Sequence, residues 1–250
     1  MQRDKIIENL EQLAPPILTD MDNIGLIVDG KNEIEVIGVT LDFSMNAIKK
    51  AIEKKCDLLI VHHGPEFKED KENEYIKKKL QLAKENDLSV FRMHLNLDFV
   101  KNGLMDSFCK LIGLKGRPEI VVYKNTKIKG GVYLAKDNLT LDDLIEGIKH
   151  LNPKSIRIAG VKKGVYRKIA VTTGAGFIPE FLDQLKPDVF ISGELTQEAI
   201  RTAEDLGITL IEVTHYLESK ALEIFSNKLK GILPLKIEFI DLGDSLEVVK

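Results

Sequence analysis

Four of the five histidines of this chain stand in three short segments, each at a place where a β-strand is expected to end. His62 and His63 close the apolar run DLLIVHH, His94 follows SVFRM, and His215 follows LIEVT. Parallel strands of an α/β sheet present such side chains from their carboxyl ends, where active-site crevices form. The two adjacent histidines point to opposite sides of an extended strand, so that each could bind its own ion. The pattern predicts that the four imidazoles gather at one site.

Two carboxylates accompany these histidines. Asp98 follows His94 by four residues, and Glu218 follows His215 by three. Residues with this spacing share one face of a helix. Imidazole nitrogens with carboxylate oxygens form the mixed donor set that borderline divalent metals take. We therefore predict a metal site with two divalent ions (Zn, Fe or Mn), while scattered structural histidines are the alternative.

A two-metal centre can generate a hydroxide nucleophile near neutral pH and polarise the bond under attack, so a hydrolase is the natural enzymatic interpretation. Glu194, in the segment SGE before an expected helix, either caps that helix or acts as an acid beside the ligands. Glu194 and Glu218 are the candidates to take or relay a proton, depending on which of them binds metal. The Gly-containing segment 172–176 could approach a phosphate or a nucleobase, and residues 22–23 could hold a loop beside the site. His150 ends another expected helix, where the helix dipole accounts for it, and is left out of the site.

Strands and helices alternate along the chain in a way that favours mostly parallel sheets. In the first half, helices are expected at 2–13, 44–56, 71–87 and 99–114, and strands at 22–30, 33–43, 57–63 and 88–94. In the second half, helices are expected at 140–151, 179–186, 196–207 and 217–231, and strands at 127–135, 155–161, 168–174, 188–194, 208–215 and 234–241.

The expected fold class is α/β, with two α/β modules of mostly parallel or mixed sheets. The first module comprises residues 1–123 together with 232–250 and carries the HH and HxNLD ligands. The second comprises residues 124–231 and carries the HY..E ligands. The closing strand alternates polar and apolar residues and could return to the sheet of the first module.

The composition excludes few classes of protein. The chain has 250 residues, with 36 Lys+Arg against 39 Asp+Glu and a formal net charge of −3. This balance gives no overall attraction to nucleic acid, although lysines cluster locally at 77–79, 124–129 and 154–168. No apolar run approaches the roughly 18 residues of a membrane span, so no membrane partner is expected. Cys56 and Cys109 are expected to fill core space, and the protein is expected to be cytoplasmic.

Several segments, taken together, resemble one known family. MDNIGLIVDG resembles an opening WDNxGL segment, VTLDFSMNAIKKAIEKKCDLLIVHHG a strand–helix–HH unit, and HLNLD an HTNLD motif. SGELTQEAIRTAEDLGITLIEVTHYLES is similar to a closing GE…GHxxxE segment. On this combination, which runs nearly end to end, the chain resembles the NIF3-like family, also called the GTP cyclohydrolase I type 2 family.

The resemblance implies a dinuclear metal site formed by the residues at the matching positions, His62, His63, His94, Asp98, His215 and Glu218. It also implies an NIF3-like fold with the metal site between the two modules, and a toroidal homohexamer whose cavity the metal sites face. The chain departs from the family pattern at Met21, which replaces an aromatic residue, at Leu95, which replaces threonine, and at Gly64, which precedes the expected proline. Many members place the last carboxylate one residue later, where this chain has Ser219.

Three classes of function remain open. The first is a metal-dependent hydrolase that acts on a nucleotide or a related heterocycle, for which the family name suggests opening of the GTP purine ring with loss of formate. The second is a ring that binds DNA through sequence-independent phosphate contacts from lysines such as Lys162, Lys163 and Lys168. The third is a metal-binding regulator without catalysis.

If the ring forms, multi-angle light scattering should give a particle mass near six times 28.1 kDa, because closed symmetry is the usual outcome for a soluble homo-oligomer. The measurement is made at micromolar chain concentration, and a dilution series controls for weak association. A clean monomer in that range would contradict both the ring and the threading of DNA through it.

Overall fold

The structure is a computed structural model that describes residues 1–15, 24–65, 73–115, 119–122 and 131–249. Met21, residues 22–23 and the lysines at 124–129 therefore lie outside the described residues.

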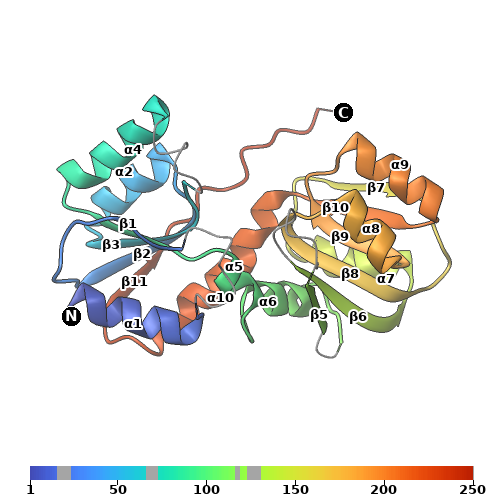
Figure 1. The fold of residues 1–250 in the computed structure, drawn as a ribbon, viewed down its shortest axis with the longest axis horizontal. Coiled ribbons are helices and arrows are strands. Elements are labelled where there is room, and N and C mark those ends of the chain that lie inside the picture. Colours follow the sequence, from blue (N-terminus) through green and yellow to red (C-terminus); the bar gives the residue numbers. More distant parts are fainter. Residues whose placement is uncertain (16–23, 66–72, 116–118, 123–130, 250) are drawn as a thin grey trace. The chain divides into compact units, whose positions relative to one another are not determined.

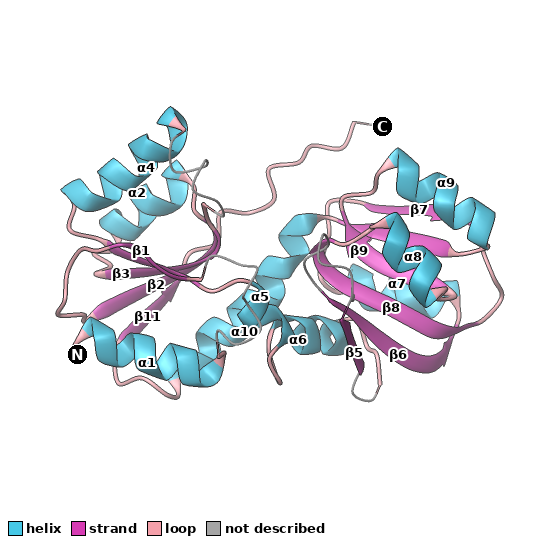
Figure 2. Ribbon diagram, in the orientation of Figure 1, coloured by secondary structure: helices cyan, strands magenta, loops and turns pink. Residues whose placement is uncertain are grey.

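The chain forms two compact units, Met1–Gly103 with Leu222–Gly243 and Leu104–Ala221 with Asp244–Lys250. Each unit is a mixed sheet covered by helices, so the expected α/β class is confirmed (Figure 1, Figure 2). The module boundaries expected from the sequence, 1–123 with 232–250 and 124–231, stay a prediction.

The first unit is built on a five-stranded sheet with the strand order β1-β4-β3-β2-β11. Its strands are β1 (Gly25–Val28), β2 (Val36–Asp42), β3 (Leu58–His63), β4 (Ser89–Arg92) and β11 (Lys236–Phe239). β2, β3 and β4 are parallel, β11 joins β2 in parallel, and β1 is antiparallel to β4. The closing strand thus returns to the first sheet, as its sequence pattern suggests.

Helices α2 (Met45–Glu53) and α4 (Glu74–Glu85) lie on one face of this sheet, and α1 (Arg3–Leu13) lies on the other (Figure 1). The expected N-cap of α2 is confirmed, because the Ser44 hydroxyl accepts a hydrogen bond from the Ala47 amide at 3.1 Å. The core between α2, α4 and the sheet includes Ile48, Ala51, Leu59, Val61, Ala83 and Val90.

The second unit is built on a six-stranded sheet with the order β5-β6-β8-β9-β10-β7. Its strands are β5 (Glu119–Val122), β6 (Gly131–Leu139), β7 (Ile156–Gly160), β8 (Tyr166–Ala175), β9 (Val189–Gly193) and β10 (Thr209–Val213). β8, β9 and β10 are parallel, and the other pairings are antiparallel. No strand is expected there from the sequence, although the β-branched residues of the segment EIVV are a signal that could find β5.

Helices α8 (Pro179–Leu185) and α9 (Gln197–Leu206) lie side by side on one face of this sheet, and α7 (Leu141–Lys149) lies on the other (Figure 2). Helix α10 (Glu218–Lys230) begins in the second unit and ends in the first. The core of the second unit includes Phe177, Phe181, Leu182, Phe190, Ala199 and Ala203.

The helix expected over 99–114 is present as α6 (Leu104–Leu111), but it begins later than predicted. A separate short helix, α5 (Leu95–Phe99), precedes it. Between them Asn102 has a φ of 61°, and a Cβ at Gly103 would lie 2.1 Å from the Leu97 carbonyl oxygen. Only glycine permits so close an approach of the backbone, so the turn ends the first helix.

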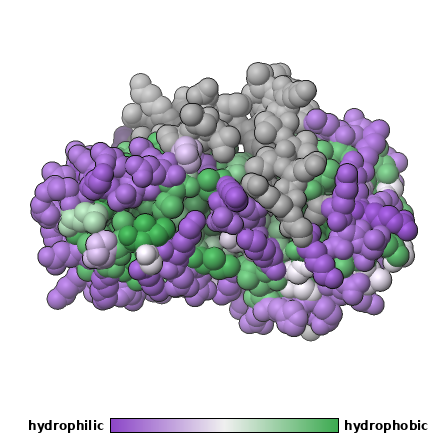
Figure 3. All heavy atoms as spheres, turned by 90° about the horizontal axis from the view of Figure 1, so that it is seen from below, coloured by the Kyte–Doolittle hydropathy of each residue, from purple (hydrophilic) through white to green (hydrophobic). Residues whose placement is uncertain are grey.

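On the face drawn in Figure 3, hydrophilic residues cover most of the visible area, with hydrophobic areas between them. None of the described helices is long and apolar enough to cross a membrane. Both cysteines are free and buried, and burial raises the pKa of Cys56 to about 11 and that of Cys109 to about 12. Neither thiol is therefore expected to react at neutral pH.

Asp188 precedes β9, and hydrogen bonds to its carboxylate connect that strand to the beginning of β8. Its carboxylate accepts hydrogen bonds from Lys163 Nζ at 2.8 Å and from the amides of Arg167 and Lys168 at 2.9 Å. Burial opposes ionisation of the carboxyl, but these donors outweigh burial and hold the pKa of Asp188 at about 2.

The substitution Asp188→Asn should lower the free energy of unfolding by about 1–2 kcal/mol at pH 7, a figure discounted for partial exposure of the carboxylate. Because the folded-state pKa lies below the ~3.9 of an unfolded aspartate, this stabilisation is present above about pH 5 and is lost as the pH falls toward 2. Urea unfolding of both proteins across this pH range measures the effect. The exposed Asp205→Asn is the matched control and should change stability by less than about 0.5 kcal/mol. Equal urea midpoints for Asp188→Asn and the parent at pH 7 would contradict the assignment.

Candidate functional site

Three histidine rings gather at the carboxyl ends of β3 and β4 in the first unit. His62 and His63 are the last residues of β3, and His94 follows β4 by two residues. The ring centroids lie 4.7 Å apart for His62 and His63, 5.0 Å for His62 and His94, and 5.6 Å for His63 and His94. One ligand atom of each ring lies within 4.8 Å of the other two, a grouping that could hold a metal ion.

Hydrogen-bond acceptors stand behind two of these rings. His62 Nδ1 lies 2.8 Å from the Met93 carbonyl oxygen, and His63 Nδ1 lies 2.9 Å from Asp42 Oδ1. Asp42 and His63 are paired neighbours at the ends of β2 and β3. Because carbonyl and carboxylate oxygens only accept, each neutral ring carries its hydrogen on Nδ1 and its lone pair on Nε2. Metal-ligating histidines have this arrangement in proteins.

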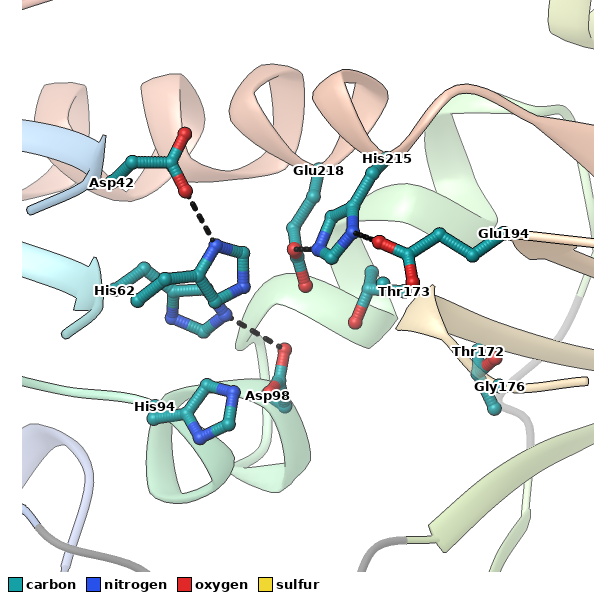
Figure 4. A network of polar contacts seen from close by, with 12 residues as sticks. Asp42, His62, His94, Asp98, Thr172, Thr173, Gly176, Glu194, His215 and Glu218 are labelled. Carbon is teal, nitrogen blue, oxygen red and sulfur yellow. Dashed lines mark hydrogen bonds and ion pairs between the residues drawn. The ribbon is translucent and has the colours of Figure 1, made fainter. Parts of the chain in front are cut away.

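The Asp98 carboxylate is buried beside His62. Asp98 lies in the short helix α5, and its amide donates to the His94 carbonyl at 3.0 Å. Asp98 Oδ1 lies 3.6 Å from His62 Nε2, and only 6% of the Asp98 side chain is exposed. The expected helical turn after His94 therefore returns the carboxylate to the histidines, next to His62 (Figure 4).

A guanidinium group stands behind the third ring. Arg92, the last residue of β4, is fully buried, and its Nη2 lies 2.8 Å from His94 Nδ1. A Cβ at Gly64 would lie 3.1 Å from Arg92 Cδ, so the glycine leaves room for the arginine side chain. The sequence analysis does not single out Arg92, although a charged residue within the apolar strand SVFR is a signal that could find it.

In the second unit, His215 and Glu218 form a close pair. His215 begins a 3₁₀ turn (His215–Leu217) after β10, and Glu218 is the first residue of α10. His215 Nε2 lies 3.2 Å from Glu218 Oε2, whose side chain is 3% exposed. His215 Nδ1 donates to Glu194, so this ring also presents its lone pair on Nε2 (Figure 4).

The sequence leaves two roles open for Glu194, a helix cap or an acid beside the ligands, and the hydrogen bonds decide between them. Glu194 does not cap the following helix, because Thr196 does so by accepting a hydrogen bond from the Ala199 amide at 3.2 Å. The Ser219 hydroxyl is buried and has no hydrogen-bond partner among the described residues, whereas the Glu218 carboxylate lies against His215. The carboxylate three residues after the histidine is therefore in contact with it, and its equivalence to the last carboxylate of the family pattern stays a prediction.

The Gly-containing segment 172–176 is not a loop, since residues up to Ala175 belong to β8. The Thr172 and Ser192 hydroxyls lie 2.6 Å apart, and Ser192 Oγ accepts from the Gly176 amide at 2.9 Å. This network ties β8 to β9. It occupies the Gly176 amide, which a phosphate at this segment would need.

Gly174 keeps the space in front of His215 open. Its φ is 57°, and a Cβ there would lie 3.2 Å from His215 Nε2 and 3.7 Å from Glu218 Oε2. Two ligands of a tetrahedral ion with bonds of about 2.0–2.1 Å lie about 3.3–3.4 Å apart. The nitrogen–oxygen separations of 3.6 Å in the first unit and 3.2 Å in the second are close to this value. The donor types and spacings in each unit therefore fit a divalent metal ion.

The substitution Gly174→Ala should weaken binding of a divalent ion to the second unit about tenfold, because the added methyl group crowds His215 Nε2. Gly207→Ala is the matched control, since Gly207 also has a positive φ of 68° but no atom within 4 Å of the added carbon. Both variants should lose about 1–2 kcal/mol of stability from the left-handed backbone. Zinc titration calorimetry and thermal unfolding measure the two effects, and equal zinc affinities in the two variants would contradict a ligand role for His215.

Comparison with known proteins agrees with the resemblance seen in the sequence. The profile of the Duf34/NIF3 (NGG1p interacting factor 3) family matches residues 1–244. A GTP cyclohydrolase 1 type 2 homolog from Methanocaldococcus jannaschii is 34% identical over 253 aligned positions, which cover 96% of this chain and 100% of the relative. The solved structure of reduced HcgD from Methanocaldococcus jannaschii has a TM-score of 0.83 and 31% identity, and the match covers 97% of this chain and 98% of that one. A Staphylococcus aureus protein shares the fold, with a TM-score of 0.82 and 22% identity over 100% of this chain and 99% of that one. The chain therefore belongs to the Duf34/NIF3 family.

Proposed function

We propose that the protein is a metal-dependent hydrolase that acts on a nucleotide or a related heterocycle. Two divalent ions, of Zn, Fe or Mn, would be held by His62, His63, Asp98, His215 and Glu218. The observation that carries this proposal is repeated in both units: a buried carboxylate lies beside the Nε2 atom of an imidazole whose Nδ1 atom contacts an acceptor. The position of the ions between the two modules, which the resemblance implies, is part of the proposal.

A buried histidine–carboxylate ion pair is the structural alternative for each pair. A charged imidazole would donate from both ring nitrogens and would need no open space before Nε2. Gly174, with its left-handed backbone, keeps such a space open in front of His215. This favours an external ligand over an ion pair.

Divalent ions in such a site polarise the bond under attack and lower the pKa of water, which is the chemistry that hydrolysis requires. The protein's own residues would orient the ligands and move protons. Asp42 and Glu194 hold the rings of His63 and His215 from behind. The Glu194 side chain is 55% exposed and contacts His215, so it can exchange a proton with solvent and is the proposed relay. Glu218 is assigned as a ligand in this scheme.

The proposed substrate class is taken from the names of similar proteins. Proteins that match nearly the whole chain carry the name GTP cyclohydrolase 1 type 2 homolog, which suggests a purine nucleotide. GTP is the narrower candidate within that class.

Nucleic-acid binding by a homohexameric ring is the second candidate, and a non-catalytic metal-binding regulator is the third. Of the lysines expected to contact DNA, Lys163 pairs with Asp188 at 2.8 Å, and Lys168 donates to the Leu185 carbonyl. These partners compete with a phosphate for both ammonium groups. We therefore rank DNA binding below hydrolysis.

Metal content and turnover test the proposal together. Purified protein should carry up to two divalent ions per chain. Asp98→Asn keeps the side-chain size but removes a charge, so it should lower metal occupancy by at least one ion and abolish metal-dependent turnover of a nucleotide panel. The exposed Asp87→Asn removes the same charge elsewhere in the first unit and should change neither quantity.

Three other outcomes would count against parts of the proposal. Full metal retention in Asp98→Asn would contradict the ligand assignment. Metal binding by the parent without turnover of any nucleotide would favour the regulator. Salt-sensitive DNA retention that survives Asp98→Asn, with no turnover, would favour the binding ring.

A further inference from the structure

We propose that His94 is not a metal ligand but a hydrogen-bond donor, which the buried guanidinium of Arg92 holds with its hydrogen on Nε2. The acceptor would be an oxygen of a phosphoryl oxyanion bound beside the ligating histidines. This inference rests on the metal site proposed above and assigns a different role to one of the four histidines at the site.

The contact between Arg92 and His94 decides where the imidazole hydrogen lies. Arg92 Nη2 stands 2.8 Å from His94 Nδ1. A guanidinium group has only donors, so His94 Nδ1 must accept and cannot carry a hydrogen. A doubly protonated ring would place two donors against each other, and the ring in this contact is therefore neutral with its hydrogen on Nε2.

The contacts behind the neighbouring rings are of the opposite kind. His62 Nδ1 faces the Met93 carbonyl oxygen and His63 Nδ1 faces the Asp42 carboxylate, which leave the lone pair of each ring on Nε2. His94 lies in the same cluster, with its centroid 5.0 Å from His62, yet its Nε2 carries a hydrogen. An N–H group cannot coordinate a cation, but it can donate to an oxygen held next to one.

Both partners of this contact are fixed by their surroundings. Arg92 is 0% exposed, and the missing side chain at Gly64 makes room for its aliphatic part. The His94 amide donates to Asn96 Oδ1 at 3.0 Å, and Asn96 Nδ2 donates to the Ala14 carbonyl at 2.8 Å. Arg92 therefore cannot turn away without disturbing buried packing, and the hydrogen bonds around Asn96 hold the backbone from which the His94 ring extends.

An N–H donor beside metal-binding histidines favours an anion that is rich in acceptor oxygens and can also contact the metal ions. Phosphoryl groups have this chemistry, because each offers several strong acceptor oxygens. The phosphoryl group could belong to a nucleotide or be free phosphate. Binding of inorganic phosphate, of AMP and of adenosine to the metal-loaded protein distinguishes these sources, since adenosine lacks the group.

Metal stoichiometry is the first test, and it needs no turnover. His94→Asn should retain the metal content of the parent, whereas the matched His63→Asn should lose at least part of it. A loss in His94→Asn as large as that in His63→Asn would overturn the proposal.

The imidazole tautomer is the second test. Long-range ¹H–¹⁵N NMR of the metal-loaded protein should show His94 with its hydrogen on Nε2, and His62 and His63 with theirs on Nδ1. Arg92→Lys keeps the charge but not the planar fork, and Gly64→Ala displaces the arginine; each should shift the His94 signals toward a mixture. If Arg92→Lys does not fold, Gly64→Ala still provides the test. A His94 hydrogen on Nδ1 in the parent protein would overturn the proposal.

Anion affinity is the third test. His94→Phe keeps a ring but removes the donor, so inorganic phosphate and AMP should bind about 10- to 100-fold more weakly, as expected for a lost hydrogen bond to a charged group. Adenosine binding should not change. Unchanged phosphate affinity would overturn the donor role. Absence of metal from the parent would instead contradict the proposed function, and the His94 tautomer can still be measured in the metal-free protein.

Discussion

The parallel pairing of β2, β3 and β4 is the constraint on which the site in the first unit depends. Parallel strands end at one edge of a sheet, so His62, His63 and the residues after β4 arrive together. The same register sets Asp42 opposite His63 and thereby supplies the acceptor behind that ring. A slip by one residue would turn every side chain of β3 to the other face of the sheet. The apolar runs that bury both faces of these strands thus also set the chemistry at their ends.

The groups that contact Nδ1 of the four imidazoles determine what each Nε2 atom can do. An imidazole is a ligand or a donor according to which nitrogen carries the hydrogen, and the partner of Nδ1 makes that choice. Oxygen acceptors stand behind His62, His63 and His215, while a guanidinium stands behind His94. In the proposed site, three of the histidines would therefore be metal ligands and the fourth a hydrogen-bond donor.

Much of the fold could be predicted from the sequence because its elements are long and strongly patterned. The N-cap at Ser44 and the strand ends at the histidines follow from local signals. The turn at Gly103 could not be predicted, because it depends on a close backbone approach that no spacing reveals. The grouping of His62, His63 and His94 was expected from the strand ends. The contact of Arg92 with His94 was not, because neighbouring positions do not disclose which nitrogen a side chain approaches.

The sheet of the first unit takes its edge strand β11 from near the end of the chain. β11 pairs with β2, and the Thr40 hydroxyl donates to the Ile240 carbonyl at 3.1 Å across 200 residues of sequence. The second unit is almost continuous in sequence, from Leu104 to Ala221. During synthesis on the ribosome, β11 therefore emerges after residues 104–221, and until then the β2 edge keeps unpaired amides and carbonyls. A chain truncated before β11 would expose that edge, to which a chaperone or another chain could pair.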